Sequence, residues 1–180
     1  ASGSFAEYTK VRESRGIAKK PDNMSFAQAA AVPIAAITAL QALRDQGQLQ
    51  PGQSVLNNGA SGGVGTFAVQ IAKHFGAEVT GVCSTRNLDM VRGLGADHVI
   101  DYTHEDFTEG SKQYDLIIDN VANHDLLDMR QALKPTGTLV LVGGGGVDAG
   151  PWIEIFMNPI KAKLLSAFVD QKMVFFVADM

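Results

Sequence analysis

The sequence contains a single cysteine, Cys83, among 180 residues, and its four histidines are isolated from one another. One cysteine excludes an internal disulfide, and its isolation excludes a zinc site built from closely spaced Cys and His ligands. We therefore expect no metal site and a reducing compartment. The sequence as given also lacks a basic-then-apolar leader, which predicts a cytoplasmic protein.

Positive charge is scarce as well, with 15 Lys and Arg residues against 19 Asp and Glu residues and a formal net charge of -4. Such a balance gives no general attraction to nucleic acid or to anionic membranes. No uninterrupted apolar run approaches the roughly 20 residues that a membrane helix needs. The sequence therefore predicts neither a nucleic-acid partner nor a membrane partner.

What the chain does contain is an alternation of short apolar runs and helical patterns. Continuous apolar strands between helices indicate a parallel sheet covered on both faces, that is, an α/β, doubly wound six-stranded sheet. Strands are expected at 54–58, 78–83, 98–102, 115–119, 138–143 and 172–178. Helices are expected at 64–75, 87–94 and 124–133, which end before Gly76, Gly95 and Pro135.

The N-terminal third carries different patterns. Residues 4–11 alternate as a strand does. A helix capped by Ser25 follows, and we expect Pro33 to break it before a second helix that ends at Gly47. Two helices are thus predicted ahead of the first buried strand.

A glycine-rich stretch, "NNGASGGVG" at 57–65, joins the first buried strand to the next helix. A strand, a glycine turn and a helix start place free N–H groups and a positive helix end at the sheet's carboxyl edge, which suits a pyrophosphate. One glycine would permit the tight turn, the next two would admit a phosphate, and the last would let helix and strand pack closely. In that order they are Gly59, Gly62, Gly63 and Gly65, and the hydroxyl of Ser61 could bond a phosphate oxygen.

Other interpretations of this stretch exist. Glycines also mark turns that bind nothing, but a second strand ends about 20 residues later at Cys83, as a dinucleotide site requires. The loop does not end in Gly-Lys-Ser/Thr, which disfavours a kinase-type phosphate loop. A methyltransferase stays open, although it would usually have an acidic residue at the end of the second strand.

The residues after that second strand bear on the choice of cofactor. An NAD site has Asp or Glu there, whereas this chain has Ser84, Thr85 and Arg86. Hydroxyls and a guanidinium suit a 2′-phosphate, so NADPH is favoured over NADH. The alternative is that Arg86 is only a solvated charge.

Further residues fall at the same sheet edge, after later strands. Tyr102 could lie near the adenosine, and Asn120 could border a ribose of the cofactor. Gly143 and Gly144 begin a run of four glycines that would let a cofactor pass close to the backbone. Each of these could also be ordinary core or loop composition.

Several stretches together resemble the medium-chain dehydrogenase/reductase superfamily, in its zinc-independent quinone oxidoreductase-like branch. They are "GSFAEY", "AAAVPIAAITALQAL", "LQPGQSVLNNGASGGVGTFAVQIAKHFGAEVTGVCSTRN", "LGADHVIDY", "YDLIIDNV" and "LKPTGTLVLVGG". The resemblance implies an NADPH-binding Rossmann domain. It further implies an NAD(P)H-dependent reductase of quinones, enones or carbonyls, or an alcohol dehydrogenase-type oxidoreductase.

The resemblance also assigns roles to individual residues. It implies that Ser61, Gly62, Gly63 and Val64 bind the pyrophosphate, that Ser84 and Arg86 bind the 2′-phosphate, that Tyr102 lies beside the adenosine, and that Thr38 lines the nicotinamide side. Zinc-dependent relatives have a metal-binding Cys four residues before that threonine. Here the position is Ile34, so no catalytic zinc is expected.

The resemblance implies that residues 1–24 are a remnant of a barrel-like catalytic domain, that residues 25–180 form the cofactor domain, and that the parent chain is truncated at both ends. No Tyr-x-x-x-Lys is present, which excludes a short-chain reductase, and no catalytic residue is assigned.

Two hypotheses follow: a small-molecule reductase, or an isolated nucleotide-binding module without turnover. The apolar strand at 172–178 could support a homodimer.

Overall fold

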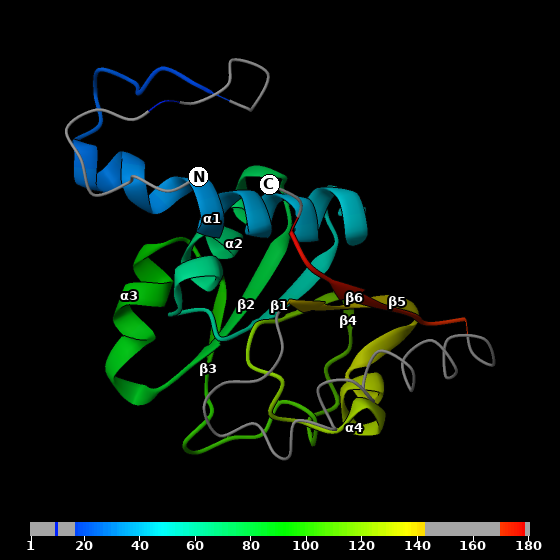
Figure 1. The fold of residues 1–180 in the computed structure, drawn as a ribbon. Helices are drawn as coiled ribbons and strands as arrows, with labels where there is room; N and C mark the ends of the chain where they lie inside the picture. The colour runs from blue at the N-terminus through cyan, green and yellow to red at the C-terminus, as the bar shows by residue number, and fades with distance from the viewer. Residues whose placement is uncertain (1–9, 11–16, 143–169, 179–180) are drawn as a thin grey trace.

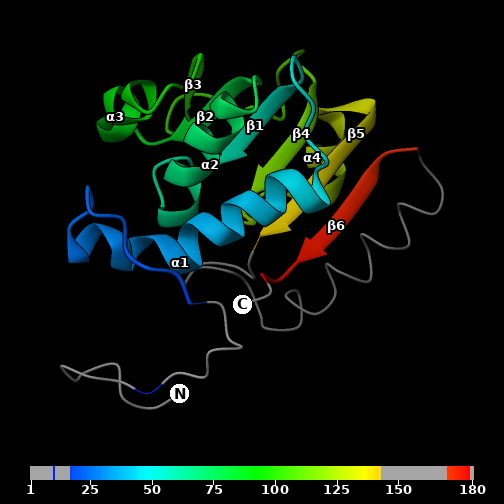
Figure 2. The same cartoon turned by 90° about the horizontal axis from the view of Figure 1, so that it is seen from above.

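The computed structural model describes residue 10, residues 17–142 and residues 170–178. Its centre is one six-stranded sheet in the order β3-β2-β1-β4-β5-β6, and every neighbouring pair is parallel. This confirms the predicted fold class. Figures 1 and 2 show the sheet with β3 and β6 at its opposite edges. The strands are β1 (Ser54–Asn58), β2 (Glu78–Cys83), β3 (His98–Asp101), β4 (Tyr114–Asp119), β5 (Leu133–Val142) and β6 (Lys172–Phe176).

Helices cover both faces of this sheet. The helices are α1 (Phe26–Gln41), α2 (Gly63–His74), α3 (Leu88–Gly93) and α4 (Leu126–Gln131), with a π-helical turn η1 (Ala42–Gln46) and a 3-10 turn η2 (Thr85–Asn87). Side chains of α1, η1, α2 and α3 belong to one buried cluster, and those of α4 belong to the other. Figure 1 shows α4 on the opposite side of the sheet from α1 and α2.

The strands supply both clusters because successive side chains of a strand point to opposite faces. In β4, Leu116 and Ile118 join the cluster under α1 and α2, while Ile117 joins the cluster over α4. All three are at most 1% exposed. Apolar residues at consecutive positions are therefore needed, which is why these strands appear in the sequence as unbroken apolar runs.

The prediction of two helices around Pro33 is wrong, because α1 runs through this residue and continues into η1. Proline removes one i to i−4 hydrogen bond. Pro33 is exposed, so water can satisfy the carbonyl that loses its partner. The Ser25 cap is confirmed: Ser25 Oγ accepts from the Gln28 N–H at 3.1 Å, and Gln28 Oε1 accepts from the Ser25 N–H at 2.8 Å.

Gly47 follows η1, but its backbone has φ −77° rather than a left-handed value. A Cβ there would lie 2.6 Å from Leu116 Cδ2, so close packing of the chain on β4 explains the glycine. The predicted end of the helical segment at Gly47 is confirmed, although the glycine is required by packing rather than by a left-handed backbone. The predicted strand at 4–11 falls almost wholly outside the described residues.

The helical segment Phe26–Gln46 has 21 residues and a mean hydropathy of 1.6, so it meets the length and composition of a membrane-crossing helix. By itself this is weak evidence for a membrane span. Its C-terminal part packs on the sheet, where Ala39, Ala42 and Leu43 are fully buried. Its N-terminal part leaves Phe26 84% and Ile34 65% exposed. The C-terminal part is thus a core helix of the fold.

Candidate functional site

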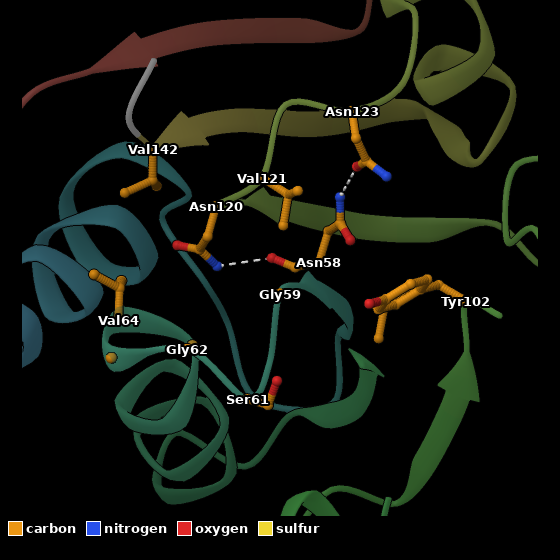
Figure 3. A pocket seen from close by; sticks show the side chains of 13 residues that line it. Asn58, Gly59, Ser61, Gly62, Val64, Tyr102, Asn120, Val121, Asn123 and Val142 are labelled. Carbon is orange, nitrogen blue, oxygen red and sulfur yellow. Dashed lines mark hydrogen bonds between the residues drawn. The ribbon is translucent and has the colours of Figure 1, made fainter. Parts of the chain in front are cut away.

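A pocket of about 550 Å³ opens at the carboxyl edge of the sheet (Figure 3). In open parallel sheets this edge is where ligands bind, next to the point where the strand order reverses. Here that point lies between β1 and β4. The walls of the pocket come from six places: the ends of β1, β2 and β5, the loop into α2, and the residues after β3 and after β4. The lining residues are Asn58, Gly59, Ser61, Gly62, Gly63, Val64, Gly65, Val82, Tyr102, Asn120, Val121, Asn123 and Val142.

The loop between β1 and α2 owes its shape to two glycines. Gly59 has φ +84°, a left-handed conformation that side chains rarely adopt, and its Cβ would lie 2.8 Å from Val121 Cγ2. At Gly65, in the first turn of α2, a Cβ would lie 2.1 Å from the Gly59 carbonyl oxygen. The loop therefore folds back on its own helix, and side chains at these two positions would force it open.

The other two glycines lie at the surface, and a Cβ on Gly62 would lie 3.3 Å from the Gly59 carbonyl oxygen. A Cβ on Gly63 would meet only Ala35 Cβ at 4.0 Å, and both Gly62 and Gly63 are exposed. Gly62 caps α2, and no side chain bonds the first N–H groups of this helix. Free N–H groups at the positive end of a helix attract anions. The loop thus has the geometry for holding phosphate.

The residues after β1 and β4 form a polar network under the pocket. Asp119 Oδ1 accepts from Asn58 Nδ2 at 2.9 Å and from the N–H groups of Val121 and Ala122 at 3.1 and 3.0 Å. Asn58 Nδ2 also donates to Asn123 Oδ1 at 2.9 Å. These bonds join the two strand ends and fix the turn after β4.

Most of the predicted site residues come together in this pocket. The eight that line it are Gly59, Ser61, Gly62, Gly63, Val64, Gly65, Tyr102 and Asn120. Thr38, Ser84 and Arg86 are not among its lining residues, and Gly143 and Gly144 lie outside the described residues. Thr38 is 8% exposed in α1.

Ser84 and Arg86 directly follow β2, whose end lies next to Tyr102 on the pocket wall. The Tyr102 N–H donates to the Cys83 carbonyl at 3.2 Å, which brings the end of β2 against the pocket wall. Arg86 is exposed and has no hydrogen bond or ion pair with any part of the chain that the structure describes. Its guanidinium is therefore available to a ligand that extends past Tyr102.

Thr85, between these two residues, is already engaged. Its hydroxyl donates to Asp101 Oδ2 at 2.5 Å, and this bond lowers the pKa of the Asp101 carboxyl. Burial raises the pKa of the nearby Cys83 thiol, which disfavours the reactive thiolate. Neither Thr85 nor Cys83 is therefore free to bind or react.

Sequence reasoning missed five lining residues: Asn58, Val82, Val121, Asn123 and Val142. Two of them carried a signal. Asn58 is a polar residue in an apolar strand, and Asn123 follows a strand end by four residues. The valines belong to the apolar pattern of the core, which does not distinguish pocket from interior.

Comparison with known proteins places the chain in a family. A family model described as "Zinc-binding dehydrogenase" matches residues 63–167, more than half of the sequence. The chain belongs to the zinc-binding dehydrogenase family. Within it, the relatives place the chain in the quinone oxidoreductase-like branch of the medium-chain dehydrogenase/reductase superfamily, as the sequence motifs predicted.

Three members of this dehydrogenase family illustrate the similarity. The chain is 37% identical over 179 residues to a 2-methylene-furan-3-one reductase of Solanum lycopersicum, with 98% of this chain and 45% of that protein covered. It is 36% identical, with the same coverage, to an NADPH-dependent alkenal/one oxidoreductase, chloroplastic, of Arabidopsis thaliana. The solved structure of the quinone oxidoreductase from Coxiella burnetii matches with a TM-score of 0.70 and 33% identity, covering 90% of this chain and 47% of that one. The chain thus spans just under half the length of these relatives.

The name of the dehydrogenase family implies zinc, but the described residues do not fit this metal. The position where zinc-dependent members have a ligand is Ile34, an apolar side chain that cannot coordinate. Within residues 17–142 and 170–178, no group of three or more His, Cys, Asp or Glu side chains could hold a metal ion.

Proposed function

We propose that the pocket binds NADPH and that the protein serves the reduction of a quinone, enone or carbonyl compound, or the reverse alcohol dehydrogenase-type oxidation, without zinc. One observation carries the proposal: the exposed start of α2, where the N–H groups of Gly63 and Val64 have no hydrogen-bond partner among the described residues, opens on a pocket at the strand-order switch. The names of the relatives, which include an NADPH-dependent oxidoreductase and a quinone oxidoreductase, support the same chemistry.

Each end of the pocket has a separate task in this proposal. The N–H groups of Gly63 and Val64 and the hydroxyl of Ser61 would hold the pyrophosphate. Gly62, whose own N–H donates to the Gly59 carbonyl oxygen at 3.0 Å, would let the phosphate approach the backbone. Tyr102 would pack beside the adenosine, and Arg86 with Ser84 would bind the 2′-phosphate through charge-assisted hydrogen bonds. Thr38, Gly143 and Gly144 are proposed for the nicotinamide side.

NADPH, when bound, supplies a hydride from its nicotinamide ring. The part of this chain around the pocket would orient the dinucleotide rather than move protons. Of the thirteen lining residues that the structure describes, Tyr102 alone has an ionisable side chain, and it is 59% exposed. We assign no general acid or base.

That scarcity of ionisable groups favours a second candidate function, a nucleotide-binding module without turnover. A pocket that lacks Asp, Glu, His and Lys among its described lining residues can bind a dinucleotide but offers little acid or base catalysis. The two functions share the same ligand and differ only in turnover.

Titration of the purified 180-residue chain with NADPH and NADH, followed by nicotinamide fluorescence, tests the binding. Consumption of NADPH in the presence of a quinone or an enone then tests turnover. Binding with reduction supports the reductase, and binding without reduction supports the module. No binding of either nucleotide at millimolar concentration would refute both.

We further propose that residues 25–180 form the nucleotide-binding domain, that the protein is cytoplasmic and that it forms a homodimer. The net charge of -4 and the lone buried cysteine are compatible with the cytoplasm. At the edge strand β6 and just beyond it, Phe175 is 37% and Val177 75% exposed, an apolar edge that could pair with a second copy. Imaging of a fluorescent fusion and sedimentation equilibrium test these two points.

A further inference from the structure

His124 lies in the turn between β4 and α4, where its imidazole is nearly enclosed. The side chain is 14% exposed. Its ring packs against the ring of Phe107, with the centroids 4.7 Å apart and the planes tilted by 58°. Phe107 itself belongs to the buried cluster over α4. The contacts described so far give this histidine no task, although it adjoins the pocket residue Asn123.

Each ring nitrogen of His124 faces an oxygen atom. Nδ1 is 3.0 Å from Asn123 Oδ1, and Nε2 is 3.3 Å from Asp106 Oδ1. Burial raises the pKa of the Asp106 carboxyl, but hydrogen bonds from Thr108 and the charge of His124 outweigh it and lower this pKa, so the group is a carboxylate at neutral pH. A carboxylate oxygen can only accept a hydrogen bond, so Nε2 needs a proton to bond it.

The carboxamide of Asn123 is fixed with its oxygen toward His124. Asn58 Nδ2 donates to Asp119 Oδ1 at 2.9 Å, and the same nitrogen donates to Asn123 Oδ1 at 2.9 Å (Figure 3). A flipped Asn123 amide would turn its NH2 group toward the NH2 group of Asn58, so that two donors would face each other. Nδ1 of His124 therefore needs a proton as well.

The charged form of the imidazole satisfies both of these contacts, and the neutral form does not. A neutral imidazole carries one N–H group, so its other nitrogen would present a lone pair to an oxygen. Histidine is the side chain that gains and loses this second proton between about pH 5 and 8. The two contacts of His124 therefore depend on pH.

We propose that His124 is a positioning residue that, as an imidazolium, ties the loop after β3 to the turn after β4, so that loss of its proton loosens the pocket wall and weakens ligand binding as pH rises. His124 acts through Asn123 and does not touch the ligand. The inference rests on the proposed function only in taking the dinucleotide as the ligand of the pocket.

Loss of either contact reaches the pocket. Without a proton on Nδ1, the ring repels Asn123 Oδ1 and disturbs the hydrogen bond between Asn123 and Asn58, which both line the pocket. Without a proton on Nε2, the ring releases Asp106. This residue belongs to the segment between β3 and β4 that begins with Tyr102, a third lining residue.

Few charged groups surround the imidazole. Within the described residues, Asp106 is the one charged side chain at ion-pair distance from His124. Asp125, the next residue, caps α4 by accepting from the Leu127 N–H at 3.4 Å. Asp119, at the end of β4, accepts from Asn58. The pH dependence is therefore assigned to the contact of His124 with Asp106 and Asn123.

Nitrogen-15 NMR of the wild-type chain tests the protonation without any ligand. We expect both ring nitrogens of His124 to carry protons at about pH 6 and one of them at about pH 8. The side-chain amide signals of Asn58 and Asn123 should change over the same titration. A ring whose protonation does not change between these pH values, or amide signals that do not follow it, would overturn the inference.

Calorimetric titration with NADP⁺ at about pH 6 and about pH 8 measures the effect on binding. His124→Gln is the test variant, because glutamine can donate to only one of the two acceptors, as neutral histidine does. We expect wild type to bind about 3- to 10-fold more tightly than this variant at the lower pH, the effect of one hydrogen bond, and equally at the higher pH. Comparing the two proteins at each pH cancels the titration of the ligand's own 2′-phosphate.

His98→Gln is the matched control. His98 Nε2 also faces a carboxylate, Glu78 Oε1 at 2.9 Å, but it lies at the start of β3, at the opposite edge of the sheet from the pocket. This variant should bind NADP⁺ as wild type does at both pH values. An equal weakening by His124→Gln at both pH values would indicate a merely structural role and overturn the inference, with the proposed function intact. Failure of wild type to bind NADP⁺ would remove the proposed function, and the NMR titration would still decide the state of His124.

Discussion

Replacement of Gly65 by alanine tests the central claim that the shape of the glycine loop creates the site. The new Cβ would lie 2.1 Å from the Gly59 carbonyl oxygen and 2.8 Å from Ala60 Cα. Both contacts are backbone atoms, which cannot move aside by a change of rotamer. The loop would have to separate from the first turn of α2, and the pocket wall would move with it.

Two opposing effects determine how much the unfolding free energy changes in Gly65→Ala. Overpacking of a tight site costs about 1–3 kcal/mol, and more where backbone must shift. Alanine has a higher helix propensity than glycine, which stabilises a helix by up to about 1 kcal/mol. We expect Gly65→Ala to lose about 2 kcal/mol of unfolding free energy and to bind NADPH at least about 10-fold more weakly, because the phosphate-binding N–H groups lose their alignment.

Urea unfolding and NADPH titration measure the two effects. Gly93→Ala is the matched control, because Gly93 is also helical, in α3, and its Cβ would meet no atom within 4 Å. The unfolding free energy of this variant should rise by up to about 1 kcal/mol, and its affinity for NADPH should equal that of wild type. If Gly65→Ala were as stable as wild type and bound NADPH equally well, the loop would not owe its shape to close packing.

Three further changes probe other parts of the chain. Arg86→Ala should weaken NADPH about 10-fold or more and NADH little, since a charge-assisted hydrogen bond contributes about 1.5–3 kcal/mol; equal weakening in parallel titrations contradicts a 2′-phosphate role. Pro33→Ala should raise the unfolding free energy by about 1–3 kcal/mol in urea titrations, because it restores a hydrogen bond in α1; a loss of stability would show that α1 requires the proline. Burial alone would raise the pKa of Asp115, but hydrogen bonds from Lys134 and Ser54 outweigh it and lower the pKa. The stability from Asp115 is thus present above its unfolded pKa of about 3.9 and lost as pH falls through the lower folded pKa, so the deficit of Asp115→Asn in urea unfolding should shrink below about pH 4. A deficit independent of pH would contradict this account.

The strands were predictable because their burial depends on local pattern. The predicted bounds of β1 and β2 agree with the structure, since apolar residues on both faces mark a central parallel strand without ambiguity. The loop of Gly59 to Gly65 could be placed for a similar reason, because a glycine turn between a strand and a helix is a contiguous signal. These features require no knowledge of which segments meet in space.

The error at Pro33 has the opposite origin. Proline in a helix is disfavoured locally, yet α1 is held by the packing of its far end on α2 and on the sheet, where Ala39 is fully buried. The glycine at position 47 also depends on a distant contact, because the side chain of Leu116 occupies the space that a Cβ at this position would need. Tertiary contacts determine the helical backbone at Pro33 and the need for glycine at position 47, and local sequence patterns do not reveal such contacts.

The polar part of the site was the least predictable. Asn58 and Asp119 are 61 residues apart in sequence, and Asn57 and Asn120 are 63 apart, yet each pair is joined by a hydrogen bond. Sequence reasoning selected Asn120 as a candidate for bordering a ribose. It could not show that Asn57 fixes the amide nitrogen and leaves the oxygen free.

The orientation of the Asn120 amide determines which ligand groups the pocket can recognise. The glycine loop offers donors to an anion, and Asn120 offers an acceptor to a hydroxyl or an amide, so the two ends of the pocket recognise opposite hydrogen-bonding characters. A dinucleotide has phosphates in its middle and donor groups on its nucleosides, which matches this order. A simple polyphosphate has no donor for Asn120, and a simple nucleoside has no anion for the helix end. If the proposed function holds, recognition by both ends would select a nucleotide that carries a further nucleoside beyond its phosphates, because the Asn57–Asn120 hydrogen bond leaves the Asn120 oxygen as the acceptor at the second end.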